Sequence, residues 1–143
     1  MQAAIYAAIF FTVALLVTTA YFLMGGLPLL ILKHDVPLDA RFIRSFFRVY
    51  YRAAFCTSLG AMASYALWGR FAFAAGAAAI AVLSVVLARY LIGAMQNIGD
   101  SIETSGTAAI ARFRQVHTAA LSINLAQLVV VVWGVLQLSR QLS

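Results

Sequence analysis

Residues 3–32 read AAIYAAIFFTVALLVTTAYFLMGGLPLLIL, a run without a single Lys, Arg, Asp, Glu or His. As an α-helix this run is about 45 Å long, which exceeds the roughly 30 Å hydrocarbon core of a bilayer. It therefore predicts a membrane-spanning helix that must tilt or bend. Gly25, Gly26 and Pro28 mark the place for a break, because proline removes a backbone donor and disfavours helix at Leu27.

The composition of the whole chain excludes an ordinary soluble fold. Of 143 residues, 64% are hydrophobic and 10% are charged, against roughly 45–50% and about 25% in soluble domains. The first run lacks the basic start and short apolar segment of a cleaved signal peptide, so we expect a retained span. The net charge of +6 does not indicate a nucleic-acid binder, because no water-facing module remains to carry the basic residues. Cys56 has no second cysteine, which excludes an intramolecular disulfide.

Further apolar stretches predict an all-α membrane protein, a four-transmembrane-helix bundle in one domain, 1–143. The expected spans are residues 3–32, 53–69, 71–93 and 116–138. The second helix is expected to run unbroken over about residues 37–68. The fourth is expected to begin near Thr107, after a helix-breaking cluster. Alanine-rich residues 72–79, around Gly76, are expected to allow close helix packing.

Lysine and arginine are distributed unequally between the two predicted sides of the membrane. One side carries Lys33, Arg41, Arg44, Arg48, Arg52, Arg89, Arg112 and Arg114, and the other carries Arg70 and Arg140. The positive-inside tendency places the larger group in the cytoplasm. We therefore expect a multi-pass plasma-membrane protein with both termini on the non-cytoplasmic side. The second, third and fourth helices would extend beyond the bilayer on the cytoplasmic side.

Four arginines lie on one face of the second helix, within an arc of about 80° at 100° per residue. They are Arg41, Arg44, Arg48 and Arg52, and the aromatic residues Phe42, Phe46 and Tyr50 are expected opposite them. As a lipid-facing stripe, the arginines would bind anionic head groups at about 1 kcal/mol each, which makes membrane lipids the expected partners. Alternatively, Arg48 and Arg52 turn inward to hold an anionic substrate, a quinone-like ring or a partner's carboxylate.

Histidines and carboxylates on the cytoplasmic side are weak metal candidates. They are His34, Asp35, Asp100 and Glu103. Because no H-E-x-x-H or E-x-x-H spacing exists, no metal site is predicted, and no cofactor either. Asp35 is instead expected to cap a helix, and the other carboxylates to neutralise nearby arginines. If the helices continue past the bilayer, these residues would line a cytoplasmic vestibule.

Polar residues also occur inside the last span. His117 and Asn124 lie about 20° apart around the helix axis, with Gln127 about 60° further round. Polar groups that face lipid are expensive, so we expect His117 and Asn124 to point at the second or third helix, flanked by Phe113 and Leu121. One interpretation is a set of interhelical hydrogen bonds that fix the packing. The other is a catalytic or transport site.

Three features, in their order, resemble small four-helix bacterial membrane families related to the anthrone-oxygenase-like proteins. They are a first span ending in GLP at residues 26–28, RFIRSFFRVYY at residues 41–51, and RFRQVHTAALSINLAQ at residues 112–127. The resemblance covers most of the chain. It implies a four-helix fold in a bacterial inner membrane and, in some members, cofactor-free oxidation of an aromatic polyketide. His117, Asn124 and the arginines of the second helix are the residues that can be matched.

The expected function is that of a small membrane protein without enzymatic activity, an accessory subunit that associates with itself or with a larger complex. The alternative is a cofactor-free or quinone-linked oxidoreductase or oxygenase that acts on a lipophilic aromatic substrate at the cytoplasmic mouth of the bundle. The candidate catalytic residues would then be His117 as base, its neighbour Asn124, and Arg48, Arg52 or Arg89 to hold an anion.

Overall fold

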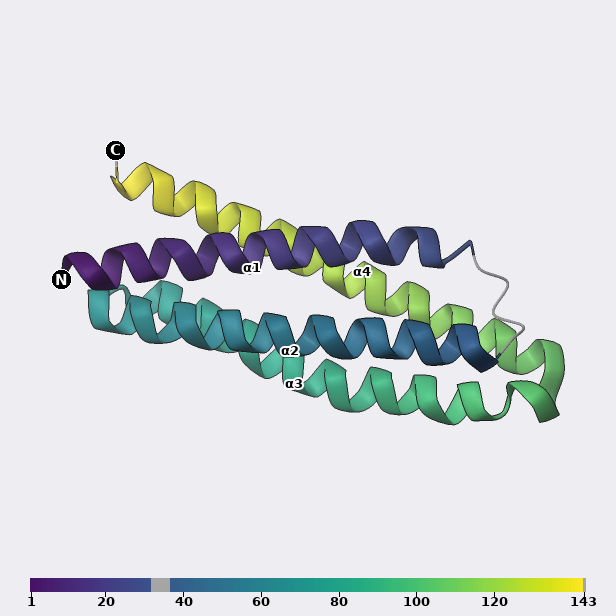
Figure 1. Ribbon diagram of the computed structural model, residues 1–143. Helices are drawn as coiled ribbons and strands as arrows, with labels where there is room; N and C mark the ends of the chain where they lie inside the picture. Colours follow the sequence, from purple (N-terminus) through teal and green to yellow (C-terminus); the bar gives the residue numbers. More distant parts are fainter. Residues whose placement is uncertain (32–36, 143) are drawn as a thin grey trace.

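The computed structural model describes residues 1–31 and 37–142 and contains four helices in that part of the chain. They are α1 (Gln2–Leu29), α2 (Pro37–Trp68), α3 (Phe71–Asp100) and α4 (Ile102–Leu142). Successive helices run in opposite directions, so the N-terminus, the α2–α3 turn and the far end of α4 lie at one end of the bundle (Figure 1). We call this the terminal end and the other the loop end. The all-helical, four-helix prediction is confirmed.

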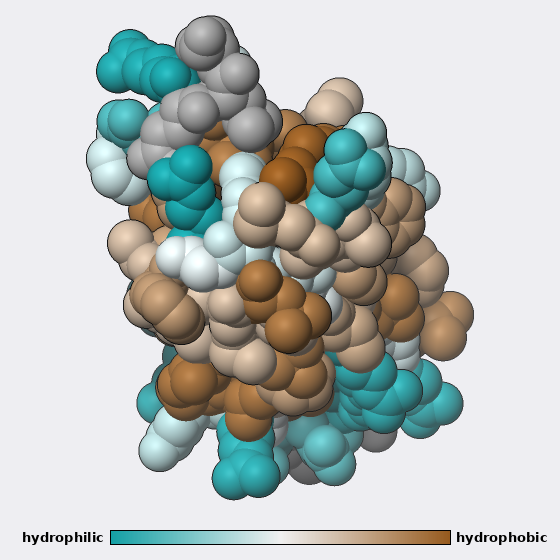
Figure 2. Space-filling view, turned by 90° about the vertical axis from the view of Figure 1, so that its left-hand side faces the viewer, coloured by the Kyte–Doolittle hydropathy of each residue, from teal (hydrophilic) through white to brown (hydrophobic). Residues whose placement is uncertain are grey.

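Three of the helices are long and apolar enough to cross a membrane. They are Gln2–Leu29, Phe71–Asp100 and Gly106–Arg140. α2 is not among them, because its first half carries the arginine stripe and only its second half, 53–68, is uncharged. Seen from the terminal end, the molecule is apolar across its middle, with hydrophilic residues in separate groups around the margin (Figure 2). These features are those of a membrane protein.

The predicted helix boundaries agree with the structure to within a few residues. α1 continues through Gly25 and Gly26 and ends at Leu29, directly after Pro28, so the span expected to reach residue 32 is shorter than predicted. The α2 prediction of 37–68 is confirmed. In α4 the backbone leaves helical geometry at Gly106, with φ of 56°, a left-handed value that favours glycine. The long, regular part of α4 therefore begins after Gly106, where the break was expected.

The helices form a ring in which each packs against its two neighbours and α4 closes onto α1. α1 and α3 are diagonal partners, as are α2 and α4, while the α2–α3 pair is packed more extensively than the α3–α4 pair. The main core, nearer the loop end, is built around Ile43, Phe47, Tyr50 and Phe113. A smaller core, which includes Tyr65, lies near the terminal end. The looser α3–α4 seam leaves room for a cleft.

Two glycines allow close approaches between helices. A Cβ atom on Gly60 would lie 2.5 Å from the Phe11 ring, and one on Gly26 would lie 2.5 Å from Leu121. These two positions bring α2 and α4 close to α1. A Cβ atom on Gly76 would meet nothing within 4 Å. The close packing expected from the alanine-rich residues 72–79 is formed towards α2, because Ala74 and Ala77 are buried in one cluster with Ala61 and Tyr65. Gly76 itself takes no part in it and lies where α3 and α4 diverge.

Candidate functional site

Three of the four arginines of α2 point away from the bundle. Arg41, Arg48 and Arg52 are exposed, as is Arg89 on α3, while Arg44 is half-buried. The inward orientation considered for Arg48 and Arg52 is wrong. The buried face of α2, which includes Phe47, lies on another side of the helix.

The aromatic residues expected opposite the arginines are divided between two environments. Tyr50 is buried, but Phe42 is 57% exposed. The buried face of α2 also includes Ile43 and Tyr51, so it is rotated away from the predicted direction. The reason is that α2 must bury a surface against both α1 and α3.

The predicted cytoplasmic vestibule is only partly within the described residues. Asp100 is exposed, whereas His34 and Asp35 lie outside the described residues, as does the side chain of Glu103. Among the residues that the structure describes, no three His, Cys, Asp or Glu side chains come close enough to hold a metal ion. One basic residue at this end has a structural role: the Arg114 guanidinium donates to the carbonyl oxygen of Leu30 over 3.3 Å. This bond caps the C-terminal end of α1.

The polar face of α4 is buried, as predicted. The exposed fractions of His117, Asn124 and Gln127 are 0%, 2% and 5%, and Phe113 and Leu121 are buried beside them. The His117 ring packs edge-on against Phe47 of α2, with 5.5 Å between the ring centres. His117 therefore faces α2.

Buried polar groups of three helices meet near the middle of the bundle. The Tyr50 hydroxyl lies near the side chains of Thr19 and Gln127, although no hydrogen bond of good geometry reaches it. The Thr19 hydroxyl instead donates to the Leu15 carbonyl over 2.8 Å. In the described structure, Asn124 has no partner for either side-chain polar atom, so the interhelical hydrogen bond expected from it is not formed.

These groups could hold a polar ligand atom, but they are enclosed. Neutral amides and phenols bind carbonyl or hydroxyl groups, whereas unpaired polar atoms in a dry interior cost free energy. His117 and Asn124 are nearly inaccessible, so a substrate would reach them only after the helices separate.

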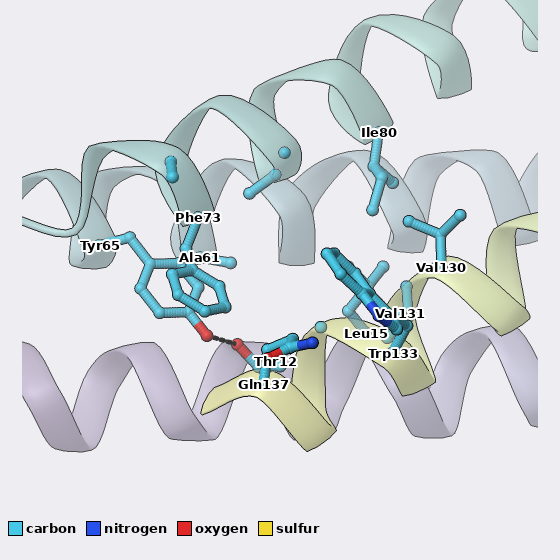
Figure 3. A pocket seen from close by; sticks show the side chains of 14 residues that line it. Thr12, Leu15, Ala61, Tyr65, Phe73, Ile80, Val130, Val131, Trp133 and Gln137 are labelled. Carbon is cyan, nitrogen blue, oxygen red and sulfur yellow. Dashed lines mark hydrogen bonds between the residues drawn. The ribbon is translucent and has the colours of Figure 1, made fainter. Parts of the chain in front are cut away.

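A lateral cleft of about 470 Å³ lies in the half of the bundle nearer the terminal end, and all four helices line it. Its floor includes Thr12 and Leu15 from α1 and Tyr65 from α2, and its walls carry Phe73 of α3 and Trp133 of α4. Figure 3 shows these side chains around the open space. Trp133 is 62% exposed, so the mouth of the cleft faces the surroundings of the bundle.

The two ends of the lateral cleft differ in polarity. At one end the oxygens of Thr12 and Tyr65 lie 2.7 Å apart, and Gln137 lies beside them (Figure 3). Towards the other end the lining is apolar and includes Ile80 and Val131. The cleft thus has an amphiphilic lining.

The sequence analysis did not find the lateral cleft. The available signal was the presence of Gly76 on α3 and Gly134 on α4, two small residues on helices that face each other. A Cβ atom on either glycine would meet nothing within 4 Å, and both line the cleft. Small residues in apolar helices usually indicate close packing. Only the divergence of α3 and α4 in the structure shows that these two glycines line a cleft instead.

The resemblance to anthrone-oxygenase-like families rests on sequence features alone. Among the described residues, the geometry supports two candidate sites, the lateral cleft and the enclosed polar residues. No protein-family model, no curated protein and no solved structure matches the chain.

Proposed function

We propose that the chain is a small integral membrane protein, an accessory subunit without enzymatic activity that binds a lipophilic molecule in the lateral cleft. The observation that carries the proposal is the cleft itself, about 470 Å³ and lined by all four helices. This volume lies within the roughly 300–1,000 Å³ of small-molecule sites, which are mostly apolar with a few polar groups. A molecule dissolved in the bilayer could enter sideways between α3 and α4.

Binding is a better interpretation of the cleft than catalysis. Its lining residues include no carboxylate, histidine, cysteine, lysine or arginine. Acid–base and nucleophilic chemistry mostly use such groups. The two hydroxyls of the lining, Thr12 and Tyr65, are hydrogen-bonded to each other, and no base lines the cleft to activate them. The cleft therefore supports recognition or storage of a ligand, by the chain alone or as a subunit of a larger membrane assembly.

In the proposed topology, the uncharged half of α2 is the fourth span. The loop end faces the cytoplasm of a bacterial cell, both termini are non-cytoplasmic, and helices α2, α3 and α4 extend beyond the inner membrane on the cytoplasmic side. This topology follows from the unequal distribution of lysine and arginine. The exposed Arg41, Arg48 and Arg52, with half-buried Arg44, would then lie against anionic head groups.

The proposal can be tested with substitutions that reduce the volume of the cleft and leave its other lining residues unchanged. Gly134→Leu and Gly76→Leu place a side chain into open space that belongs to the cleft. We expect both variants to fold and to retain less lipophilic material after purification in mild detergent, measured by mass spectrometry of the extract.

The matched control is Gly93→Leu, which also changes a glycine of α3 that has nothing within 4 Å of its Cβ position but does not line the cleft. It should retain the wild-type amount. Equal retention by all three variants would overturn the proposal.

A second candidate function is the oxidation of a lipophilic aromatic substrate, as the resemblance implies. The observation that favours it is the burial of His117, Asn124 and Gln127 on one face of α4, near Tyr50. If His117 is the base, His117→Ala should abolish turnover of an aromatic polyketide and leave the melting temperature nearly unchanged. A loss of stability alone would favour the packing role.

A further inference from the structure

The polar end of the lateral cleft has a fixed direction of hydrogen bonding. The Thr12 hydroxyl donates to the carbonyl oxygen of Ala8 over 2.7 Å. Because Thr12 has only one hydroxyl proton, the Tyr65 hydroxyl must be the donor in the 2.7 Å bond between Tyr65 and Thr12. The Tyr65 proton is thus already used, and the Tyr65 oxygen is left as an acceptor at the cleft.

Gln137 completes this end of the cleft. Its side-chain amide lies beside the Thr12–Tyr65 pair (Figure 3) and carries both a donor and an acceptor. A ligand hydroxyl at this end can donate to the Tyr65 oxygen and accept from the Gln137 amide. An ether or carbonyl oxygen can accept from Gln137 but has no proton for Tyr65. The polar end therefore matches a hydroxyl group.

The rest of the lining restricts the ligand further. No lining residue is charged, so a carboxylate or phosphate head would be buried there without a counter-charge, at a large desolvation cost. Tyr65 and Phe73 stack, with 5.2 Å between ring centres and 26° between ring planes, and Trp133 adds a third aromatic surface. Aromatic side chains favour offset or edge contacts with another flat ring.

Resting on the proposed function of the cleft, we propose that its ligand is a neutral phenol-type amphiphile, a ring that carries a hydroxyl head and an apolar tail, as in a quinol. The head binds Tyr65 and Gln137. The tail follows the apolar lining at Ile80 and Val131 towards the centre of the bundle. This orientation matches that of an amphiphile in the neighbouring leaflet, because Tyr65 lies one turn from the end of α2 at Trp68.

The test compares two probes that differ by a single proton donor, 4-decylphenol and its methyl ether 4-decylanisole. Thermal unfolding in detergent, recorded at increasing mole fractions of each probe, gives an apparent affinity. We expect the wild-type protein to bind the phenol about tenfold more tightly, the effect of one net hydrogen bond to a buried acceptor. 1-Decanol, which has the hydroxyl but no ring, should bind more weakly than the phenol.

Two variants separate the hydrogen bond from general packing. Tyr65→Phe removes the acceptor and should bring the two affinities to within about twofold. Thr12→Val keeps the Tyr65 hydroxyl but frees its proton for the ligand, so the ether should gain affinity relative to the phenol. A merely structural role of Thr12 would leave the ratio between the probes unchanged.

The outcomes distinguish this inference from the proposed function. Equal wild-type affinity for phenol and ether, or tighter binding of 4-decylbenzoate, overturns the assignment of a neutral hydroxyl head and leaves the cleft as a site. If no probe binds, or if Gly134→Leu binds 4-decylphenol as tightly as the wild-type protein does, the cleft is not a ligand site, and the proposed function is overturned as well.

Discussion

The side chain of Asn124 is buried, as the polar pattern of α4 predicts, but it lacks the hydrogen-bond partners that were expected. It is 2% exposed, and both of its side-chain polar atoms lack a hydrogen bond in the described structure. The buried hydroxyls of Ser58 and Ser84 avoid this cost, because each donates to a carbonyl oxygen four residues earlier. An amide on a helix cannot satisfy all of its donors and acceptors in that way.

The replacement Asn124→Leu tests whether this amide is a cost in the folded protein. An unsatisfied buried polar group costs about 1–3 kcal/mol, and leucine has the same branched side-chain skeleton without the polar atoms. We expect the melting temperature in detergent to rise, or at least not to fall. Asn124→Asp is the control and should lower it strongly, because a buried carboxylate has no counter-charge there. A fall with leucine would contradict the view that the unpaired amide is a net cost in the folded protein.

Among the helices, α1 is held by close contacts with both of its neighbours. α2 approaches it where Gly60 meets the Phe11 ring, and α4 approaches it where Gly26 meets Leu121. The bond from Arg114 to Leu30 adds a link between α4 and the end of α1. Apolar helices in lipid associate by such close packing, since no hydrophobic driving force acts between them.

The Gly60→Ala variant should therefore weaken the α1–α2 contact. The added Cβ would overlap the base of the Phe11 ring, not only its tip, and overpacking of this kind costs about 1–3 kcal/mol. Unfolding in a denaturing detergent should begin at a lower denaturant fraction. Gly93→Ala, which meets open space, serves as the control and should be neutral or stabilising. Equal behaviour of the two alanine variants would contradict the proposed importance of this contact.

At the scale of the whole molecule, the two ends of the bundle differ in the charged side chains that they carry. Arg41, Arg48 and Asp100 are exposed towards the loop end, whereas Arg70 lies at the α2–α3 turn of the terminal end. The Arg70 guanidinium lies 5.2 Å from the centre of the Trp68 ring. Tryptophan and arginine together are typical of a membrane–water interface.

The topology predicted from this asymmetry can be measured with reporter fusions. Fusions after Arg70 and at the C-terminus should report a non-cytoplasmic location, and an insertion at Gly106 should report the cytoplasm. Replacing Arg112 and Arg114 by glutamine should leave the orientation unchanged, because most of the basic residues remain on the same side. The reverse pattern would show that the protein inserts against the positive-inside tendency.

The sequence by itself determined the four helices, their boundaries to within a few residues, the break at Gly106 and the inward face of His117 and Asn124. These features are local, since they depend on helical periodicity, on proline and glycine, and on the cost of polar groups in lipid. Only the tertiary structure decided that Phe42 faces outward, that Asn124 lacks a hydrogen-bond partner, and that α3 and α4 separate into a cleft. The physical reason is that the path of each helix depends on side-chain volumes where helices touch, as at Gly60 and Phe11, and these pairings join residues far apart in the chain.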